Sequence, residues 1–369
     1  MVAVTGAEAA GDMFAWDRKL DKYRTPRTLR AVVELAITAA PFVLIWCAMY
    51  WSVTHGQIWL YCLLLLPAVG FLVRLFLIQH DCGHQAFLKN RTANDWIGRT
   101  ISVLTLTPYD HWRRAHATHH ATSGRLDRRG VGDIDTLTVA EYQARSKATR
   151  FRYRLYRNPL VMFAFGPFLI FVLQNRFPLG FIRGGWRPWA STMGLNVALL
   201  VAGTLLISAI GIKAFLIVHT PIMLLSAAVG GWLFYVQHQF ETTYWAEGPD
   251  WNVRTASLHG SSHYDLPPVL RWFTANIGVH HVHHLASRIP YYRLPDVLND
   301  YPELRGTGRL TFLQSFKCVR LALWDEDIRR LVSFRDIDRR GRQRARGAMR
   351  GPLESNLPVN TPVNSTGSP

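Results

Sequence analysis

The sequence predicts an all-α integral membrane protein, with four transmembrane helices in two hairpins and a cytoplasmic helical cap that carries most of the histidines. Three observations support this prediction. Hydrophobic residues make up 49% of the 369-residue chain and are concentrated in long blocks. The 42 lysines and arginines lie between these blocks, and most of the 15 histidines cluster just beyond them.

Four apolar segments predict the two hairpins. The first pair covers residues 31–51 and 57–79, joined only by SVTHG, and the second pair covers residues 189–212 and 213–237 with almost no connection. A spanning helix needs about 20 consecutive apolar residues. Each pair is therefore expected to form a tight transmembrane hairpin.

The basic residues set the expected orientation of these hairpins. Residues 1–30, the long segment 80–188 and the region after Arg288 are rich in lysine or arginine, whereas the hairpin connections offer only Lys213. Loops with such an excess stay in the cytoplasm. Residues 1–30 also lack the apolar core of a signal peptide. We expect both termini and the central segment to be cytoplasmic.

The chain is expected to form one domain over residues 31–340. It lies between the cytoplasmic segment 1–30 and a basic, then Pro/Ser/Asn-rich tail, 341–369, for which disorder is predicted. Two further apolar stretches, 100–109 and 158–175, are too short or borderline to span. We interpret both as interfacial or shallowly inserted helices, because a spanning 158–175 would move the last histidine cluster to the opposite face.

Charge and cysteine content narrow the class of protein. A net charge of +17 fits nucleic-acid binding in a soluble protein, but a membrane protein acquires the same excess from loops that face anionic lipid. We therefore expect no nucleic-acid partner. The four cysteines show neither a disulfide framework nor a CxxC pair, which indicates a reducing compartment and no thiolate metal site.

Three histidine clusters carry the functional prediction. HDCGH, HATHH and HHVHH each lie just outside an apolar block, and HxxHH occurs twice at helical spacing. Packing alone gives no reason for three imidazoles within one helical turn. We predict metal binding by His80 and His84 (first cluster), His116, His119 and His120 (second cluster), and His280, His283 and His284 (third cluster).

Six of the seven remaining histidines are interpreted as ordinary solvated or hydrogen-bonded side chains. This set includes His55, His111, His219, His259, His263 and His281.

The ligand type restricts the metal. Neutral imidazole suits zinc, copper, iron and nickel, and no thiolate or dense carboxylate set accompanies it here. Eight ligands are too many for a single ion, since a structural zinc needs four. Two iron ions that use O2 to oxidise an apolar substrate fit this ligand set best, and another redox metal stays an alternative.

In sequence and in position relative to the two predicted hairpins, these clusters closely resemble the three histidine boxes of the membrane fatty acid desaturases. The resemblance runs from about Ala31 to Pro295 and includes stretches outside the boxes, such as NPLVMFAFGPF, LFYVQHQFETTYW and HGSSHYDLPPVLRWF. Those stretches look like the bacterial acyl-lipid branch. The resemblance implies a multi-pass protein of the bacterial cytoplasmic membrane with a cytoplasmic active site.

The resemblance also implies the ligand set and the substrate. The eight histidines of the three boxes would be ligands, and a histidine at the end of the fourth helix, here His238 in FYVQHQF, would be the ninth. The first box has three residues between its histidines, whereas the acyl-CoA desaturases of animals and yeast have four. This favours a membrane lipid acyl chain over acyl-CoA.

The implied reaction introduces a cis double bond with O2 as co-substrate, using two non-heme irons and electrons from reduced ferredoxin or cytochrome b5. No catalytic side chain beyond the metal ligands is predicted. A bent tunnel between the four helices would hold the chain, and Trp232, Tyr235 and Phe240 are candidates for its lining. Tunnel depth would decide which carbons react.

Two other functions stay open on the sequence. A fatty acid hydroxylase or a carotenoid ketolase or hydroxylase would share the hairpins and the boxes. A histidine-rich metal transporter would need ionisable ligands within the spans, where only His219, Glu34 and Arg74 lie.

Overall fold

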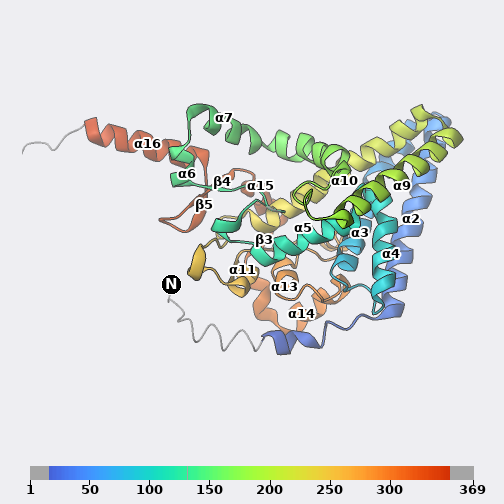
Figure 1. The fold of residues 1–369 in the computed structure, drawn as a ribbon, viewed down its shortest axis with the longest axis horizontal. Coiled ribbons are helices and arrows are strands. Elements are labelled where there is room, and N and C mark those ends of the chain that lie inside the picture. Colours follow the sequence, from blue (N-terminus) through green and yellow to red (C-terminus); the bar gives the residue numbers. More distant parts are fainter. Residues whose placement is uncertain (1–15, 131, 350–369) are drawn as a thin grey trace, which may run out of the picture.

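Four long helices form one side of the molecule, and most of the shorter elements lie on the other (Figure 1). The computed structural model describes residues 16–130 and 132–349. Within these residues four helices are long and apolar enough to cross a membrane, which confirms the four predicted spans. They are α2 (Thr28–Thr54), α3 (Ile58–Gly83), α9 (Trp186–Ile210) and α10 (Ile212–His238).

Glycines make both hairpins possible. Gly56 lies between α2 and α3 with a φ of 69°. Gly211 alone separates α9 from α10, with a φ of 81° and a ψ of 148°. Side chains with a Cβ rarely adopt these backbone conformations. The second turn therefore falls at Gly211, slightly before the boundary expected from hydropathy.

A shorter helical hairpin follows the first pair of spans. It consists of α4 (Arg91–Thr105) and α5 (Tyr109–Thr122), and Leu106 turns the chain with a φ of 52°. A Cβ atom added at Gly98 would lie only 2.2 Å from the nearest ring atom of Tyr109, so glycine leaves the space that this ring fills. Arg99 and Asp110 then join the two helices through two hydrogen bonds of 3.0 Å. The expected interfacial stretch 100–109 is thus the tip of this hairpin.

The second borderline segment is an irregular helix. After α7 (Lys147–Tyr156), the chain forms a π-helical turn, the short helix α8 (Gly166–Phe168) and a second π-helical turn. Val161–Arg176 is bent by 59° relative to α7, and the two together are long and apolar enough to count as a broken span. Many of its apolar side chains, Phe165 and Leu173 among them, are exposed. Shallow insertion of this segment stays a prediction.

The cap contains short helices and two small sheets. Its helices include α6 (Val139–Ala144), α11 (Val253–His259), α12 (Pro268–Phe273), α13 (His280–Leu285), α14 (Leu294–Asp300) and α15 (Phe312–Cys318). One sheet has the order β1-β4-β5 (Leu137–Thr138, Leu321–Asp325, Arg330–Ser333), and the other pairs β2 (His263–Asp265) with β3 (Arg309–Thr311) in parallel. These strands are too short for a recognisable alternation in the sequence, and none of them was predicted.

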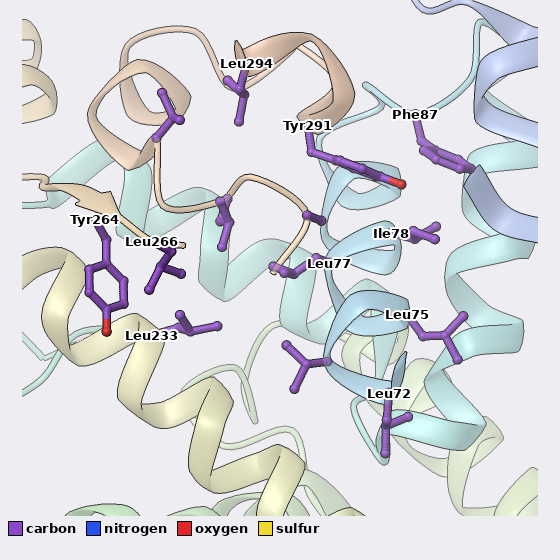
Figure 2. Packing of buried hydrophobic residues seen from close by; sticks show 14 of the residues in the cluster. Leu72, Leu75, Leu77, Ile78, Phe87, Leu233, Tyr264, Leu266, Tyr291 and Leu294 are labelled. Atoms are coloured by element: carbon purple, nitrogen blue, oxygen red, sulfur yellow. The ribbon is translucent and has the colours of Figure 1, made fainter. Parts of the chain in front are cut away.

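The main hydrophobic core joins the cap to the spans. Figure 2 shows side chains of α3 and α10 packed against the chain on either side of α13. Tyr264 and Leu266 precede α13, and Tyr291 and Leu294 follow it; all four are buried in one cluster with Leu77. The third histidine cluster is therefore held against the ends of two spans.

A buried ion pair strengthens this connection. Arg74 of α3 binds Glu34 of α2 and the carbonyl oxygen of Trp272, and both charged side chains are only 2% exposed. The Tyr291 hydroxyl donates to the same Glu34 carboxylate at 3.1 Å, and the Tyr291 amide donates to Asp81 at 2.7 Å. These bonds fix the segments before and after α13 to two spans.

The C-terminal region differs in part from the predicted disorder. Helix α16 runs from Phe334 to Met349 and so extends into the tail that was expected to begin at residue 341. Ser333 and Asp336 cap its start through reciprocal side-chain to backbone hydrogen bonds, and the arginine-, glutamine- and alanine-containing sequence favours a helix. Residues 1–15 and 350–369, with parts of the N-terminal segment and of the tail, lie outside the described residues.

Candidate metal centre

Nine histidines come together at the C-terminal ends of α3 and α10. In each of two groups, the nitrogens that could hold a metal all lie within 4.8 Å of one another. The first group, which we call site A, has five histidines, and the second, site B, has four. Together they contain all nine histidines that the sequence analysis singled out: His80, His84, His116, His120 and His283 in site A, and His119, His238, His280 and His284 in site B.

Each of the two HxxHH clusters contributes histidines to both sites. On α5, His116 and His120 face site A while His119 faces site B; on α13, His280 and His284 face site B while His283 faces site A. Each helix thus sends the two histidines that are four residues apart to the same site. Residues four apart lie about 40° from alignment on a helix, against about 60° for a spacing of three.

The two remaining elements supply the other histidines. His80, in the last turn of α3, and His84, the residue directly after this helix, are also four residues apart and join site A. His238 is the last residue of α10 and joins site B. Each site therefore receives side chains from both HxxHH helices and from the end of one span.

The ring nitrogens face one another at distances that suit a shared ion. In site A the Nε2 of His116 lies 3.0 Å from that of His80 and 3.1 Å from that of His120. In site B the Nε2 of His238 lies 3.1 Å from that of His119 and 3.0 Å from that of His280. Ligands at right angles around an ion about 2.1 Å away are about 3.0 Å apart.

Two of the site B histidines are oriented by contacts to their Nδ1 atoms. His119 Nδ1 is 2.5 Å from Asp133, and His238 Nδ1 is 3.0 Å from the carbonyl oxygen of Gly260. Each contact occupies Nδ1 and directs Nε2 into the site, as partners of metal-binding histidines do. Asp133 was missed from the sequence, although it lies in a stretch that resembles the desaturases.

Burial favours the neutral form of six of these imidazoles, all of them outside the spans. Loss of solvent, and next the neighbouring imidazoles, lower their pKa values well below the ordinary range. Neutral imidazole is the form that binds a metal. The six are His84, His116, His120, His280, His283 and His284.

The six histidines interpreted as ordinary belong to neither site. His281 is fully buried beside His263, their ring centroids 5.6 Å apart, and burial lowers its pKa to about 3. His263 Nδ1 is in turn 2.7 Å from the carbonyl oxygen of Arg305. His281 is thus buried in the cap and belongs to neither site.

A cavity of about 300 Å³ reaches both sites from between α3 and α10. His80 and His116 of site A and His280 of site B form part of its wall. Most of the other lining side chains are apolar, and Met223 and Leu72 lie farthest from the histidines along their helices. The cavity can receive an apolar chain and present it to both groups of imidazoles.

The lining differs from the candidates proposed from sequence. On α10 the cavity is lined by Gly230, Gly231, Phe234 and Gln237 at helical spacing. Trp232 and Tyr235 lie on another face of α10, where both contact Phe163, and Phe240, beyond the end of the helix, is buried in the cap core. A short aromatic run does not reveal which of its residues face inward.

An aromatic residue not singled out from the sequence closes the cavity at site A. Trp112 lines it and stacks on His116, with ring centroids 4.7 Å apart and an interplanar angle of 13°. Its position four residues before a predicted ligand was the available signal. Trp112 therefore fixes the His116 ring and contributes an apolar wall beside it.

Comparison with known proteins agrees with this site. The family model described as "Fatty acid desaturase" matches residues 57–315. A fatty acid desaturase of Bacillus subtilis is 41% identical over 320 residues, which cover 87% of this chain and 90% of that protein. Two Synechocystis proteins are similar over less of their length. An sn-1 acyl-lipid omega-3 desaturase (ferredoxin) is 30% identical over 60% of this chain and 61% of its own, and an sn-1 oleoyl-lipid 12-desaturase is 27% identical over 59% and 62%.

Proposed function

This chain belongs to the fatty acid desaturase family, and we propose that it introduces a cis double bond into an acyl chain of a membrane lipid, using O2 and an external electron donor. The observation that carries this proposal is the apolar cavity whose wall includes histidines of both sites. An unsaturated product requires hydrogen to leave two neighbouring methylenes, and this cavity would bring both to the same centre.

The residues present fit a pair of metal ions. Nine buried or half-buried imidazoles with no cysteine ligand suit iron among the metals that bind nitrogen. His84 Nε2 and His284 Nε2 are buried and have no hydrogen-bond partner, an arrangement that is costly unless a ligand occupies the site. Iron held by sites A and B would supply the O2-dependent oxidation of an unactivated C–H bond.

The protein's own part is to position the chain and exclude water. Leu72, Phe76 and Met223 line the path toward the histidines with apolar groups, so an acyl chain replaces water as it enters. Trp112 and Phe234 flank the path near the sites. In the overall reaction two hydrogens leave the chain, and with two electrons and two protons from outside they reduce O2 to two waters.

Three observations favour an acyl lipid as the substrate. The cavity lies between two candidate spans, so a chain can reach it from the bilayer. Two Synechocystis relatives are named for action on acyl lipids. The first histidine cluster also has the three-residue spacing that distinguishes it from the acyl-CoA enzymes.

The electron donor is proposed to be reduced ferredoxin or cytochrome b5. The Synechocystis omega-3 relative is named for ferredoxin, and the net charge of +17 would attract an acidic carrier. We place the protein in the bacterial cytoplasmic membrane, with both termini and the histidine sites on the cytoplasmic face, because the basic segments lie at that end of the spans.

Product analysis tests the proposed reaction. The full chain is expressed in a host whose lipids contain only saturated chains, and the fatty acids are analysed by gas chromatography and mass spectrometry. We expect new monounsaturated chains that require O2. Hydroxy fatty acids without a new double bond would instead indicate a hydroxylase on the same scaffold, and oxidised carotenoid with unchanged fatty acids would indicate a ketolase.

A further inference from the structure

A second and larger hollow lies outside the catalytic cavity. It is a groove of about 1000 Å³ between the α4–α5 hairpin and the first turns of α9. None of its lining residues also lines the cavity at the histidine sites. Helix α5 separates the two spaces: Arg113, Arg114 and Ala117 face the groove, whereas Trp112 and His116 face the cavity.

One end of the groove is strongly basic. Four arginines and one aspartate line it, so positive charge is in excess. Arg99 is paired with Asp110, and Arg113 lies 3.1 Å from Asp95. Arg114 and Arg187 have no carboxylate partner among the described residues. Two guanidinium groups, one on each side of the groove, are therefore free to bind an anion.

The other end of the groove is apolar and follows a membrane span. From Arg187 the lining continues along α9 through Gly194 and Leu195 to Ala198, a distance of about 16 Å at 1.5 Å per residue. Val103, near the tip of the hairpin, lies on the opposite wall. The groove thus reaches about halfway into a hydrocarbon core of about 30 Å.

Two tryptophans mark the level at which the basic end meets the bilayer. Trp96 on α4 and Trp186 at the start of α9 both line the groove, and they are 62% and 74% exposed. Tryptophan is enriched at the boundary between headgroups and acyl chains. The arginines therefore lie at headgroup level and the small apolar residues at acyl-chain level.

We propose that this groove binds an anionic glycerophospholipid, with its phosphate between Arg114 and Arg187 and its acyl chains along α9. Arginine suits phosphate because its planar fork can donate two hydrogen bonds to two oxygens. The bound lipid joins α5, which carries three of the nine histidines, to α9. It is distinct from the substrate, because α5 lies between the groove and sites A and B.

A lipid fits this groove better than an acidic electron carrier. A carrier could reach the arginines but not the lining at Leu195 and Ala198, which lies within the candidate span. A phospholipid matches both ends, its phosphate with the guanidinium groups and its chains with the apolar wall. The inference does not depend on the reaction proposed above, since it concerns binding alone.

The test compares two lipids on the purified full chain. Dioleoyl phosphatidylglycerol or dioleoyl phosphatidylcholine is titrated onto the protein in detergent, and bound lipid is counted by native mass spectrometry. A basic residue near an anionic surface contributes about 5-fold in affinity. We therefore expect Arg114→Gln/Arg187→Gln to bind phosphatidylglycerol roughly 25-fold more weakly, whereas binding of phosphatidylcholine, whose choline offsets the phosphate charge, falls less.

Matched variants separate the groove from general charge. Arg128→Gln/Arg152→Gln removes two exposed arginines outside the groove and should bind phosphatidylglycerol as the wild type does. If the first double variant does not fold, Arg187→Gln alone, at an exposed side chain, should lose about 5-fold. Equal binding of the two lipids by the wild type would overturn the proposal. Unchanged lipid binding in the groove variants would also overturn the proposal, even if these variants lose their association with reduced ferredoxin.

Discussion

At the scale of single residues, the centre depends on which nitrogen of each imidazole is left for a metal. Asp133 and the Gly260 carbonyl occupy Nδ1 of His119 and His238, so the Nε2 of each faces site B. In site A the stacked ring of Trp112 restrains His116. These imidazoles are therefore held in place by neighbours that are not among the nine proposed ligands.

Loss of one ligand should abolish activity, whereas loss of the buried histidine next to the ligands should not. His283→Ala removes a site A imidazole and His119→Ala a site B imidazole, so neither variant should form unsaturated product. His281 belongs to neither site, and His281→Ala should keep measurable activity at some cost in thermal stability. Fatty acid analysis of expressing cells provides the measurement. Activity lost in all three variants, or in none, would contradict the assignment.

Asp133 should act by orienting His119. Removing a partner of a metal-binding histidine typically costs about 10- to 100-fold in metal affinity or activity. We expect Asp133→Ala to lose this much iron affinity, measured by chelator competition, and Asp133→Asn, which keeps a hydrogen-bonding group, to lose less. Asp135→Asn changes an exposed neighbour and is the control. Equal iron affinity in Asp133→Ala and Asp135→Asn would exclude this role.

The convergence of the nine histidines could be predicted from the sequence, because clusters at helical spacing leave little freedom in where the side chains point. Metal binding by these histidines stays a prediction, and the residues that orient them were missed. Asp133 could not be recognised in the same way, since its contact depends on how the loop after α5 folds back onto that helix. The division of each HxxHH cluster between two sites also required the crossing of α5 and α13.

At the scale of elements, the spans and a helical cap were predictable, and the small sheets of the cap were not. Runs of about 20 apolar residues identify spanning helices, and all four are present within a few residues of their predicted ends. The small sheets formed by β1 to β5 pair segments far apart in the chain, for example Leu137 with Leu323. Strands of two to five residues carry no usable periodicity.

The buried pair between α2 and α3 should be essential for stability. Breaking a buried ion pair leaves an uncompensated charge and costs about 3–5 kcal/mol, while replacing both partners by apolar residues costs less. In detergent we expect Glu34→Leu to lower the melting temperature more than Glu34→Leu/Arg74→Met does.

The exposed pair of Glu241 and Arg330, 3.2 Å apart, provides the matched control, since surface pairs contribute about 0–1 kcal/mol. Glu241→Leu should therefore change the melting temperature little. A double variant less stable than Glu34→Leu would show that the charges are not what stabilises this contact.

The cavity along α10 should set the length of chain that is accepted. Met223 lines its far end, about 21 Å along the helix from Gln237 near the histidines. Met223→Trp should shift the unsaturated products toward shorter chains. Leu224, the next residue, is 39% exposed and outside the cavity, so Leu224→Trp should leave the chain-length distribution unchanged. The same distribution in both variants would argue against this path.

At the scale of the whole molecule, the proposed oxidising centre lies where a chain from the membrane could reach it. The spans open an apolar cavity between α3 and α10, and the cap closes over its end with nine imidazoles. Buried hydrogen bonds keep the cap in a fixed position relative to the spans. They join Glu34, Arg74 and Asp81 to the chain around α13. Substrate and centre can then meet without exposure to water.

The most direct test of the central claim is mass spectrometry of an intact lipid. The purified chain is loaded with iron, reconstituted with a defined phosphatidylcholine that carries one deuterated saturated chain, and supplied with O2 and reduced ferredoxin. We predict that the intact lipid loses two deuterium atoms from neighbouring carbons of that chain and gains no oxygen, and that His283→Ala shows no change. A lipid that gains oxygen, or deuterium loss that occurs only from acyl-CoA, would contradict the account.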